Sequence, residues 1–225
     1  MFLQEFRRRL FDHLLARIQG QPYTGDENDF TDLERDQIVI DLNRIYEHKI
    51  IWFMSTTYDA RRIEESANPR THADVMVLSH EDGSEERPAF PYWHARIVGI
   101  YHVMVRQRTQ GNTGLTDPRR MDVLLVRWFG LDSGEGRSGW CARRMHSIGF
   151  LPDTDALGPA FGFLDPSEVI RMVHLIPDYV SGRTKDLLSG SSMAIQTRHP
   201  DGEYKSYYVA MYVRRIYLYA FLTVF

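Results

Sequence analysis

Apolar residues recur with helical spacing at the start of the chain. Over residues 2–18 every fourth position is apolar, at Phe2, Phe6, Leu10, Leu14 and Ile18. Polar residues, among them Asp12 and His13, fall on the other side of the same helical wheel. The pattern predicts an amphipathic helix over residues 2–18. Because an isolated helix of this length is marginal in water, we expect its apolar face to be covered by the rest of the protein or by another chain.

The remaining apolar residues occur in short runs rich in β-branched and aromatic side chains. Such runs predict strands, roughly seven here, separated by turn residues. They lie at 38–40, 50–58, 73–78, 94–106, 121–129, 140–150 and 204–212. We expect 94–106 and 121–129 to be neighbouring antiparallel strands. Two short helical segments are also predicted: a turn opened by a Thr31/Glu34 capping box, and a helix from Asp165 through about Val173.

This order of elements favours a mainly β (α+β) fold. We predict a small, partly open antiparallel β-barrel with an N-terminal amphipathic helix and one or two short helices. The expected organisation is a helical extension at 1–36, a single barrel-like domain at 37–213, and an apolar C-terminus at 214–225.

Composition excludes several classes of protein. Of the 225 residues 43% are hydrophobic, which is too many for a disordered chain. A single cysteine, Cys141, cannot form an internal disulfide, so we expect a reducing, intracellular compartment. The most apolar stretch, 207–225, is interrupted by Arg214 and Arg215, and we therefore expect no membrane span.

Positive charge is concentrated in the middle of the chain. Residues 93–150 carry nine basic and four acidic side chains, whereas residues 1–92 carry 11 basic and 18 acidic ones. Six arginines fall near the ends of strands that we expect to be adjacent: Arg106, Arg108, Arg119, Arg120, Arg143 and Arg144. They are candidates for binding the phosphates of DNA, provided that they lie exposed on one face without carboxylate partners. The alternative is a solvated rim paired with the acidic first third of the chain.

Four aromatic residues are candidates for a binding pocket: Tyr92, Trp93, Trp128 and Trp140. Rings of this kind cage methylated lysine or stack on bases. The competing interpretation is an aromatic barrel core, since aromatic residues dominate the buried area of small domains.

No pattern of catalytic or metal-binding residues is convincing. The G-x-G-x-x-G match at 134–139 precedes a strand-like run, whereas a dinucleotide site needs a helix there. Cys141 and His146 are five residues apart on a predicted strand and would face opposite sides. Asp153 and Asp155, together with Asp122 or Asp165, offer carboxylates for a two-metal site, but the first two lie in a predicted loop and no rigid element fixes them. The sequence thus predicts a protein without catalytic residues, metal or cofactor.

The order of several motifs resembles that of a known but uncharacterised family. The motifs are TTYDARR at 56–62, NPRTHADVMV at 68–77, HARIVGIYH at 94–102, MDVLLVRWFG at 121–130, FGFLDP at 161–166 and HLIP at 174–177. They are similar to the C-terminal domain of transposon-encoded proteins of mushroom-forming fungi, over residues 3–213. The resemblance implies a non-enzymatic part of a larger transposon protein. After 213 the chain departs from the family's usual end.

A fainter similarity concerns the strands between residues 73 and 129, which resemble the opening of bromo-adjacent homology domains. These are chromatin-binding β-barrels, so the similarity implies a nuclear interaction module. We therefore expect a DNA- or chromatin-interaction module. The alternative is a structural domain without a ligand, which packs on other domains of a transposon protein.

Overall fold

The computed structural model describes residues 2–23, 28–56, 62–79, 91–108, 114–131, 145–152, 160–187, 202–210 and 221–224. The helical elements are α1 (Phe2–Ile18), α2 (Asp32–Arg35) and the 3-10 helix η2 (Pro166–Glu168). The first strands are β1 (Ile38–His48), β2 (Ile51–Thr56), β3 (Arg62–Ala67), β4 (Asp74–Leu78), β5 (Tyr92–Gln107), β6 (Arg119–Leu131) and β7 (Ser147–Phe150). The others are β8 (Phe161–Leu164), β9 (Val169–Met172), β10 (His174–Pro177), β11 (Arg183–Thr184), β12 (Glu203–Tyr204), β13 (Tyr207–Ala210) and β14 (Phe221–Val224). The predicted mainly β class is confirmed.

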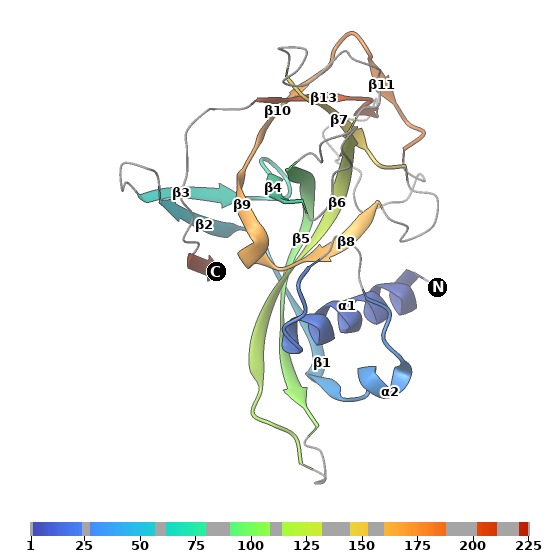
Figure 1. The fold of residues 1–225 in the computed structure, drawn as a ribbon, viewed down its shortest axis with the longest axis vertical. Coiled ribbons are helices and arrows are strands. Elements are labelled where there is room, and N and C mark those ends of the chain that lie inside the picture. The colour runs from blue at the N-terminus through green and yellow to red at the C-terminus, as the bar shows by residue number, and fades with distance from the viewer. Residues whose placement is uncertain are drawn as a thin grey trace.

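Nine of these strands form one antiparallel sheet built around β5 and β6 (Figure 1). Its order is β10-β13-β7-β6-β5-β4-β9, with β1 added to β5 and β8 added to β6. The two end strands of this path, β10 and β9, do not pair with each other in the described part of the chain, so the sheet is not closed there. A second sheet has the order β14-β2-β3, and β11 pairs with β12.

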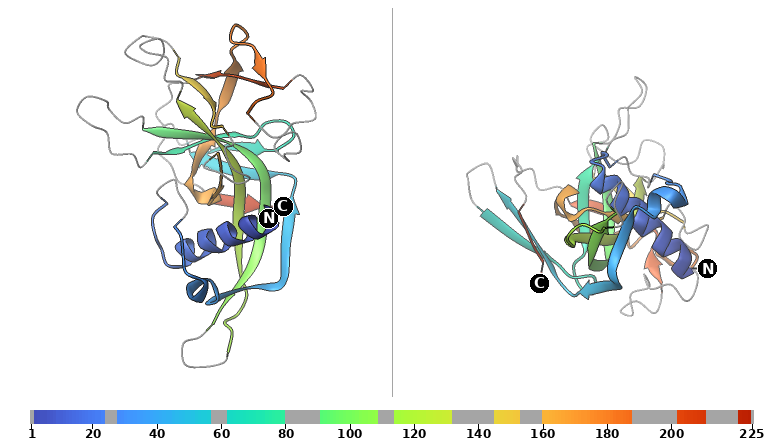
Figure 2. Two further views of the ribbon diagram at one scale, coloured as in Figure 1. Left: turned by 90° about the vertical axis from the view of Figure 1, so that its right-hand side faces the viewer. Right: turned by 90° about the horizontal axis from the view of Figure 1, so that it is seen from below.

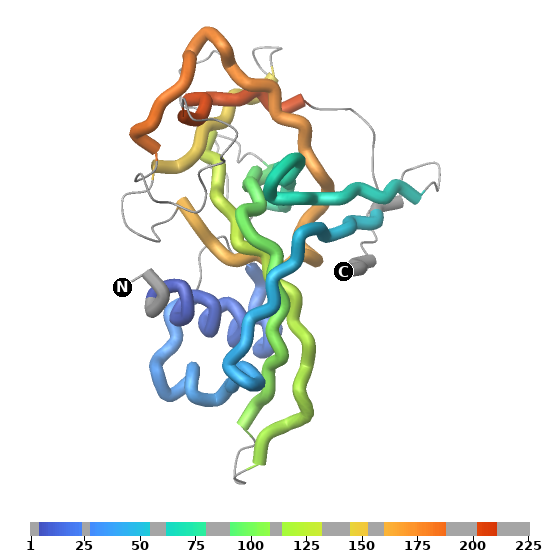
Figure 3. Tube along the Cα trace, turned by 180° about the vertical axis from the view of Figure 1, so that it is seen from behind, coloured from blue at the N-terminus to red at the C-terminus, as the bar shows by residue number. Residues whose placement is uncertain are grey.

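Strands β5 and β6 are antiparallel neighbours, as their long apolar runs predict. Their pairing extends from His94 opposite Phe129 to Val105 opposite Arg119. The far ends of the two strands, joined by β1, reach beyond the other elements as a long arm (Figures 1 and 3). We call residues 38–48, 100–108 and 119–124 the arm.

Helix α1 covers one face of the arm (Figure 2). Leu10 and Leu14 of the helix are buried in a cluster that includes Val103 of β5 and Val123 of β6. The expectation that the apolar face of α1 is covered is therefore confirmed. Burial of these side chains is the main favourable term that holds the helix in place, because its length alone gives little stability in water.

Two residues that the periodicity placed on the polar side of α1 are in fact buried. Asp12 is 2% exposed and His13 is 4% exposed. Asp12 is buried because Arg35 of α2 lies over it and donates from Nε and Nη2 to its two carboxylate oxygens, at 2.7 and 2.9 Å. His13 packs beside Phe163 of β8, with 6.0 Å between ring centroids. Both partners are distant in sequence, so the helical pattern did not indicate them.

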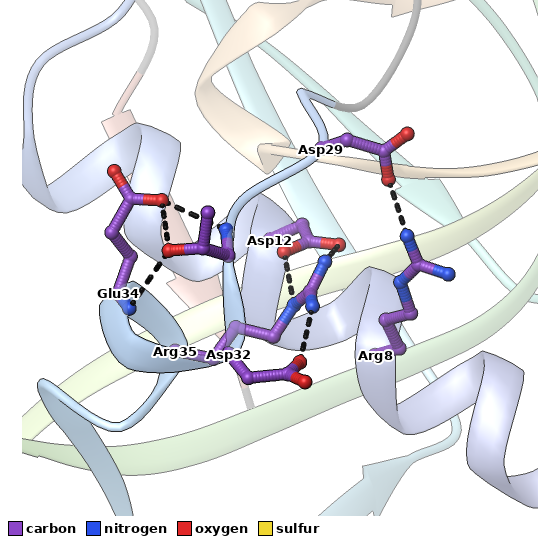
Figure 4. A network of polar contacts seen from close by, with 7 residues as sticks. Arg8, Asp12, Asp29, Asp32, Glu34 and Arg35 are labelled. Carbon is purple, nitrogen blue, oxygen red and sulfur yellow. Dashed lines mark hydrogen bonds and ion pairs between the residues drawn. The ribbon is translucent and has the colours of Figure 1, made fainter.

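The capping box at α2 forms as predicted (Figure 4). Glu34 Oε2 accepts from the Thr31 backbone amide at 2.8 Å, and the Glu34 amide donates to Thr31 Oγ1 at 3.4 Å. These contacts orient the four-residue helix so that Arg35 reaches both Asp32 and Asp12. The short helix thereby ties the chain before β1 to α1.

Two predicted elements need correction. The helix expected from Asp165 through about Val173 ends at Glu168, because the β-branched residues that follow form β9 and pair with β4. Asp165 does cap this turn, accepting from the Ser167 amide at 2.9 Å. Strand β1 is longer than the predicted run 38–40, since pairing with β5 carries its polar half as far as His48.

Part of the chain near the C-terminus joins the smaller sheet. Phe221–Val224 pair with Ile51–Met54 of β2, within the segment that the sequence assigns to a separate apolar C-terminus. Among the described residues, no helix has the length and apolar character needed to cross a membrane.

Candidate nucleic-acid interface

The arm has two different faces. On one, Val103, Val105 and Val123 pack beneath α1. Side chains alternate along a strand, and directly paired residues share a face. The residues between them in sequence, such as His102 and Met104, therefore lie on the opposite face, which is buried at Ile100 and Leu124 and opens to solvent toward the end of the arm. We call this the solvent face of the arm.

The described arginine candidates are divided between these two faces. Arg106 and Arg108 alternate with Val105, and Arg120 is paired with Met104, so these three share the solvent face. Arg119 is paired with Val105 and lies on the α1 side instead. The expectation of a single face is wrong for Arg119.

The position of Arg119 also affects the end of α1. Burial lowers the pKa of Arg17, Asp165 and Asp122 oppose that shift, and the charge of Arg119 adds to it. Arg17 is held there by an ion pair with Asp165 at 2.6 Å.

The arginine candidates Arg143 and Arg144 lie outside the described residues.

Two arginines on the solvent face have carboxylate partners. Arg106 Nε donates to Asp41 Oδ1 at 2.8 Å, and Arg120 Nη2 lies 3.0 Å from Asp122 Oδ1. Both pairs are partly exposed to solvent. The expectation of unpaired arginines is therefore wrong for Arg106 and Arg120, whereas exposed Arg108 has no carboxylate partner in the described part of the chain.

The solvent face contains functional candidates that the sequence did not single out. Arg44 of β1 is exposed and likewise has no carboxylate partner among the described residues. It was missed because it lies in the acidic first third of the sequence and joins the basic middle third only through the pairing of β1 with β5.

Three rings stack on the same face. Tyr46 is paired with His102, their ring centroids are 4.6 Å apart, and their planes are inclined by 7°. His48 also stacks on His102, with 4.8 Å between ring centroids, and His48 Nε2 lies 2.6 Å from His102 Nδ1. The pKa of His102 is lowered, first by burial and then by the charges of Arg120 and His48, while Asp122 opposes the shift.

The predicted aromatic pocket residues that are described contribute to the core. Trp128 is 7% exposed, meets Trp93 edge-on and stacks with Tyr23. Both tryptophans pack in a cluster that joins β4, β5, β6 and β9 of the large sheet to Ile51 and Phe53 of β2. This arrangement agrees with the alternative interpretation, in which these aromatic residues form part of the core and not a binding pocket. Tyr92 begins β5 at its pairing with Leu78, and Trp140 lies outside the described residues.

A cluster of aromatic rings does surround cations, but these are the protein's own. The guanidinium carbon of Arg127 is 3.8 Å from the ring centroid of Phe150, and that of Arg96 is 5.0 Å from the same ring. Arg96 also pairs with Asp74 at 2.7 Å, and Arg127 pairs with Glu203. The sites against these rings are therefore already filled.

Candidate catalytic and metal-binding groups do not converge in the described structure. Within those ranges no group of three or more His, Cys, Asp or Glu side chains is placed to hold a metal ion. Asp122 pairs with Arg120, and Asp165 caps η2 and pairs with Arg17. The 134–139 motif, Cys141, Asp153 and Asp155 lie outside the described residues.

Comparisons with known proteins add no relatives. No family model, no curated protein and no solved structure matches the chain. The geometry of the arm is therefore the feature from which a function is inferred.

Proposed function

We propose that this protein is a non-enzymatic DNA-interaction module that binds through the arm. The observation that carries the proposal is the gathering of arginines near the end of the projecting arm. Arg106 lies near the end of β5, Arg108 directly follows that strand, and Arg119 and Arg120 open β6. Exposed guanidinium groups at the end of a projecting element can contact the phosphates of duplex DNA without base-specific contacts.

The existing ion pairs weaken this surface without removing it. Exposed ion pairs contribute about 0–1 kcal/mol, so a phosphate can replace Asp41 or Asp122 at small cost. A guanidinium group also has five N–H donors, and Arg106 uses its Nε toward Asp41. The remaining donors of Arg106 are available for a phosphate oxygen.

The wider context of the proposal comes from the resemblances in sequence. We propose that the module belongs to a transposon-encoded protein, acts on chromatin in the nucleus, and has the partly open barrel of the bromo-adjacent homology type. Within the described residues the antiparallel sheet is not closed, which supports this proposal, because such barrels are incompletely closed antiparallel sheets. The proposed function requires no cofactor.

The test is binding to labelled duplex DNA by the full chain. Replacing Arg108 and Arg119 by Ala should weaken binding about equally for unrelated duplex sequences and reduce the slope of log K against log salt concentration by about 2. Arg70→Ala, in the exposed turn before β4, is the matched control and should leave the slope unchanged. An unchanged slope in the double variant, or an equal loss in the control, would contradict binding through the arm.

A structural or assembly role is the second candidate, and one observation favours it. Strand β1 and the turn after it expose three apolar side chains, Leu42, Ile45 and Ile50, and Leu42 is 71% exposed. The backbone of Leu42 has a φ of 54°, a conformation that leucine rarely adopts. Such a surface suits a contact with another domain. A chain that binds no DNA at low salt but associates with increasing concentration would favour this role.

A further inference from the structure

The solvent face of the arm combines positive charge with an exposed aromatic ring. Tyr46 is 39% exposed although its ring stacks on His102. Most tyrosines of the sheet are more deeply placed, as Tyr207 is at 6%. An aromatic ring at an uncovered sheet face is therefore a specific feature of the arm.

The stack holds Tyr46 in one orientation. His102 covers one face of the tyrosine ring in a nearly parallel arrangement, and His102 is fixed in turn by the short contact with His48. Strand β1 pairs with β5 and with no further strand among the described residues, so the second face of the Tyr46 ring looks toward the edge of the sheet. Within the described structure that second face has no ring or cation against it.

Cations lie on both sides of this ring. Arg44 precedes Tyr46 by two residues on β1, and Arg120 lies beyond His102 on β6, where its charge lowers the pKa of His102. The distance between β1 and β6 is that of two strand spacings, about 10 Å. Adjacent phosphates of an extended single strand lie closer together than this, and the long, flexible side chains of the two arginines can lean toward each other to meet them.

We propose that the solvent face of the arm binds single-stranded nucleic acid, with one base stacked on the free face of Tyr46 and the flanking phosphates on Arg44 and Arg120. This inference rests on the proposed function and names its ligand more closely. A base against Tyr46 extends a stack that His102 and His48 already preform, so little side-chain freedom is lost on binding.

The ring selects against a fully paired duplex. In a duplex each base is covered on both faces by its neighbours, and an aromatic side chain reaches a base face only by unstacking. An unpaired strand offers its bases at no such cost. Stacking on Tyr46 therefore favours single strands, whereas the arginines attract either form.

The experiment compares a labelled oligothymidylate of about 12 nucleotides, a length within the usual site size, with the same strand in a duplex. We expect the full chain to bind the single strand more tightly. Tyr46→Ala should weaken single-strand binding about tenfold and duplex binding less than about twofold, since a stacked base contributes about 1–3 kcal/mol. Tyr46→Phe keeps the ring and should bind like the unaltered protein.

Tyr179→Ala is the matched control, because Tyr179 is 72% exposed on the turn after β10 and far from the arm in the sheet order. The ring signals of Tyr46 in the unaltered protein should also move upfield when the oligothymidylate is added, which tests the stack without a substitution. An oligouridylate of the same length distinguishes RNA from DNA as the source of the strand.

Three results overturn the inference. Equal affinity for single strand and duplex, or equal losses on both in Tyr46→Ala, would leave an electrostatic DNA-binding surface without a base platform. An unmoved Tyr46 signal in the saturated complex would exclude stacking in the same way. Failure to bind either form at low salt would overturn both this inference and the proposed function.

Discussion

Replacing Glu203 by Gln is expected to lower the free energy of unfolding by about 3–5 kcal/mol. The reason is the burial of its partner. Arg127 is 1% exposed, and Glu203, itself 13% exposed, is the carboxylate that pairs with it. The glutamine side chain would occupy the same volume while leaving a buried guanidinium charge without compensation.

The surroundings of Arg127 offer little to replace that carboxylate. Its Nη2 is 3.5 Å from the Leu187 carbonyl oxygen, its Nε has no hydrogen-bond partner among the described residues, and its face lies on the Phe150 ring. Burial lowers the pKa of Arg127, Glu203 opposes that shift, and the charge of nearby Arg96 adds to it. Removing the carboxylate of Glu203 therefore leaves the buried charge of Arg127 beside the like charge of Arg96.

Urea denaturation of the full chain measures the effect. Asp29→Asn is the control, because Asp29 and its partner Arg8 are 84% and 48% exposed, and such pairs contribute about 0–1 kcal/mol (Figure 4). Losses of similar size in the two variants would show that Arg127 is compensated by other groups.

Local pattern was sufficient to predict the centre of the fold. The apolar, β-branched runs of β5 and β6 are long enough to predict strands rather than helices or loops. Their antiparallel pairing follows from the single polar connection between them. The α1 helix and the Thr31/Glu34 capping box were predictable for the same reason. Each depends on residues within four positions of one another.

Features that depend on distant pairing were not predictable. The contact between His48 and His102 joins positions 54 residues apart, and the pair of Arg127 with Glu203 joins positions 76 apart. The sequence around each of these residues contains no pattern that indicates its partner. The burial of Asp12 has the same origin, since Arg35 reaches it from a separate helix.

The arginine candidates illustrate both cases. Their proximity in space followed from the predicted hairpin, because both strand ends meet at its tip. Their faces and partners did not follow, because a shift of one residue in register exchanges the two faces of a strand. Asp41 reaches Arg106 through the pairing of β1, which extends well beyond its apolar run.

Stability is also expected to fall steeply between pH 7 and pH 5. Burial, and then the charge of Arg17, lowers the pKa of His13 from 6.5 to about 3, and burial, then His146, lowers the pKa of His94 from 6.5 to about 4. In the unfolded chain both rings protonate near their ordinary pKa of about 6.5. The unfolded state therefore binds more protons below that pH, and stability is lost as the pH falls from about 6.5 toward these lower values.

Each histidine should account for about 2 kcal/mol of the loss at pH 5, or about 4 kcal/mol together, since one pKa unit corresponds to about 1.4 kcal/mol. Urea denaturation at pH 7 and pH 5 measures the difference. His13→Leu should remove about half of it, because leucine fits the apolar site beside Phe163 and the Nε2 of His13 has no hydrogen-bond partner to lose among the described residues. His174→Gln, at an exposed position of β10, is the control and should leave the pH dependence unchanged. If the His13→Leu variant lost as much unfolding free energy between pH 7 and pH 5 as the unaltered protein does, His13 would contribute nothing to the pH dependence. His13 would then be accessible to protons in the folded state, and α1 would not seal this part of the core.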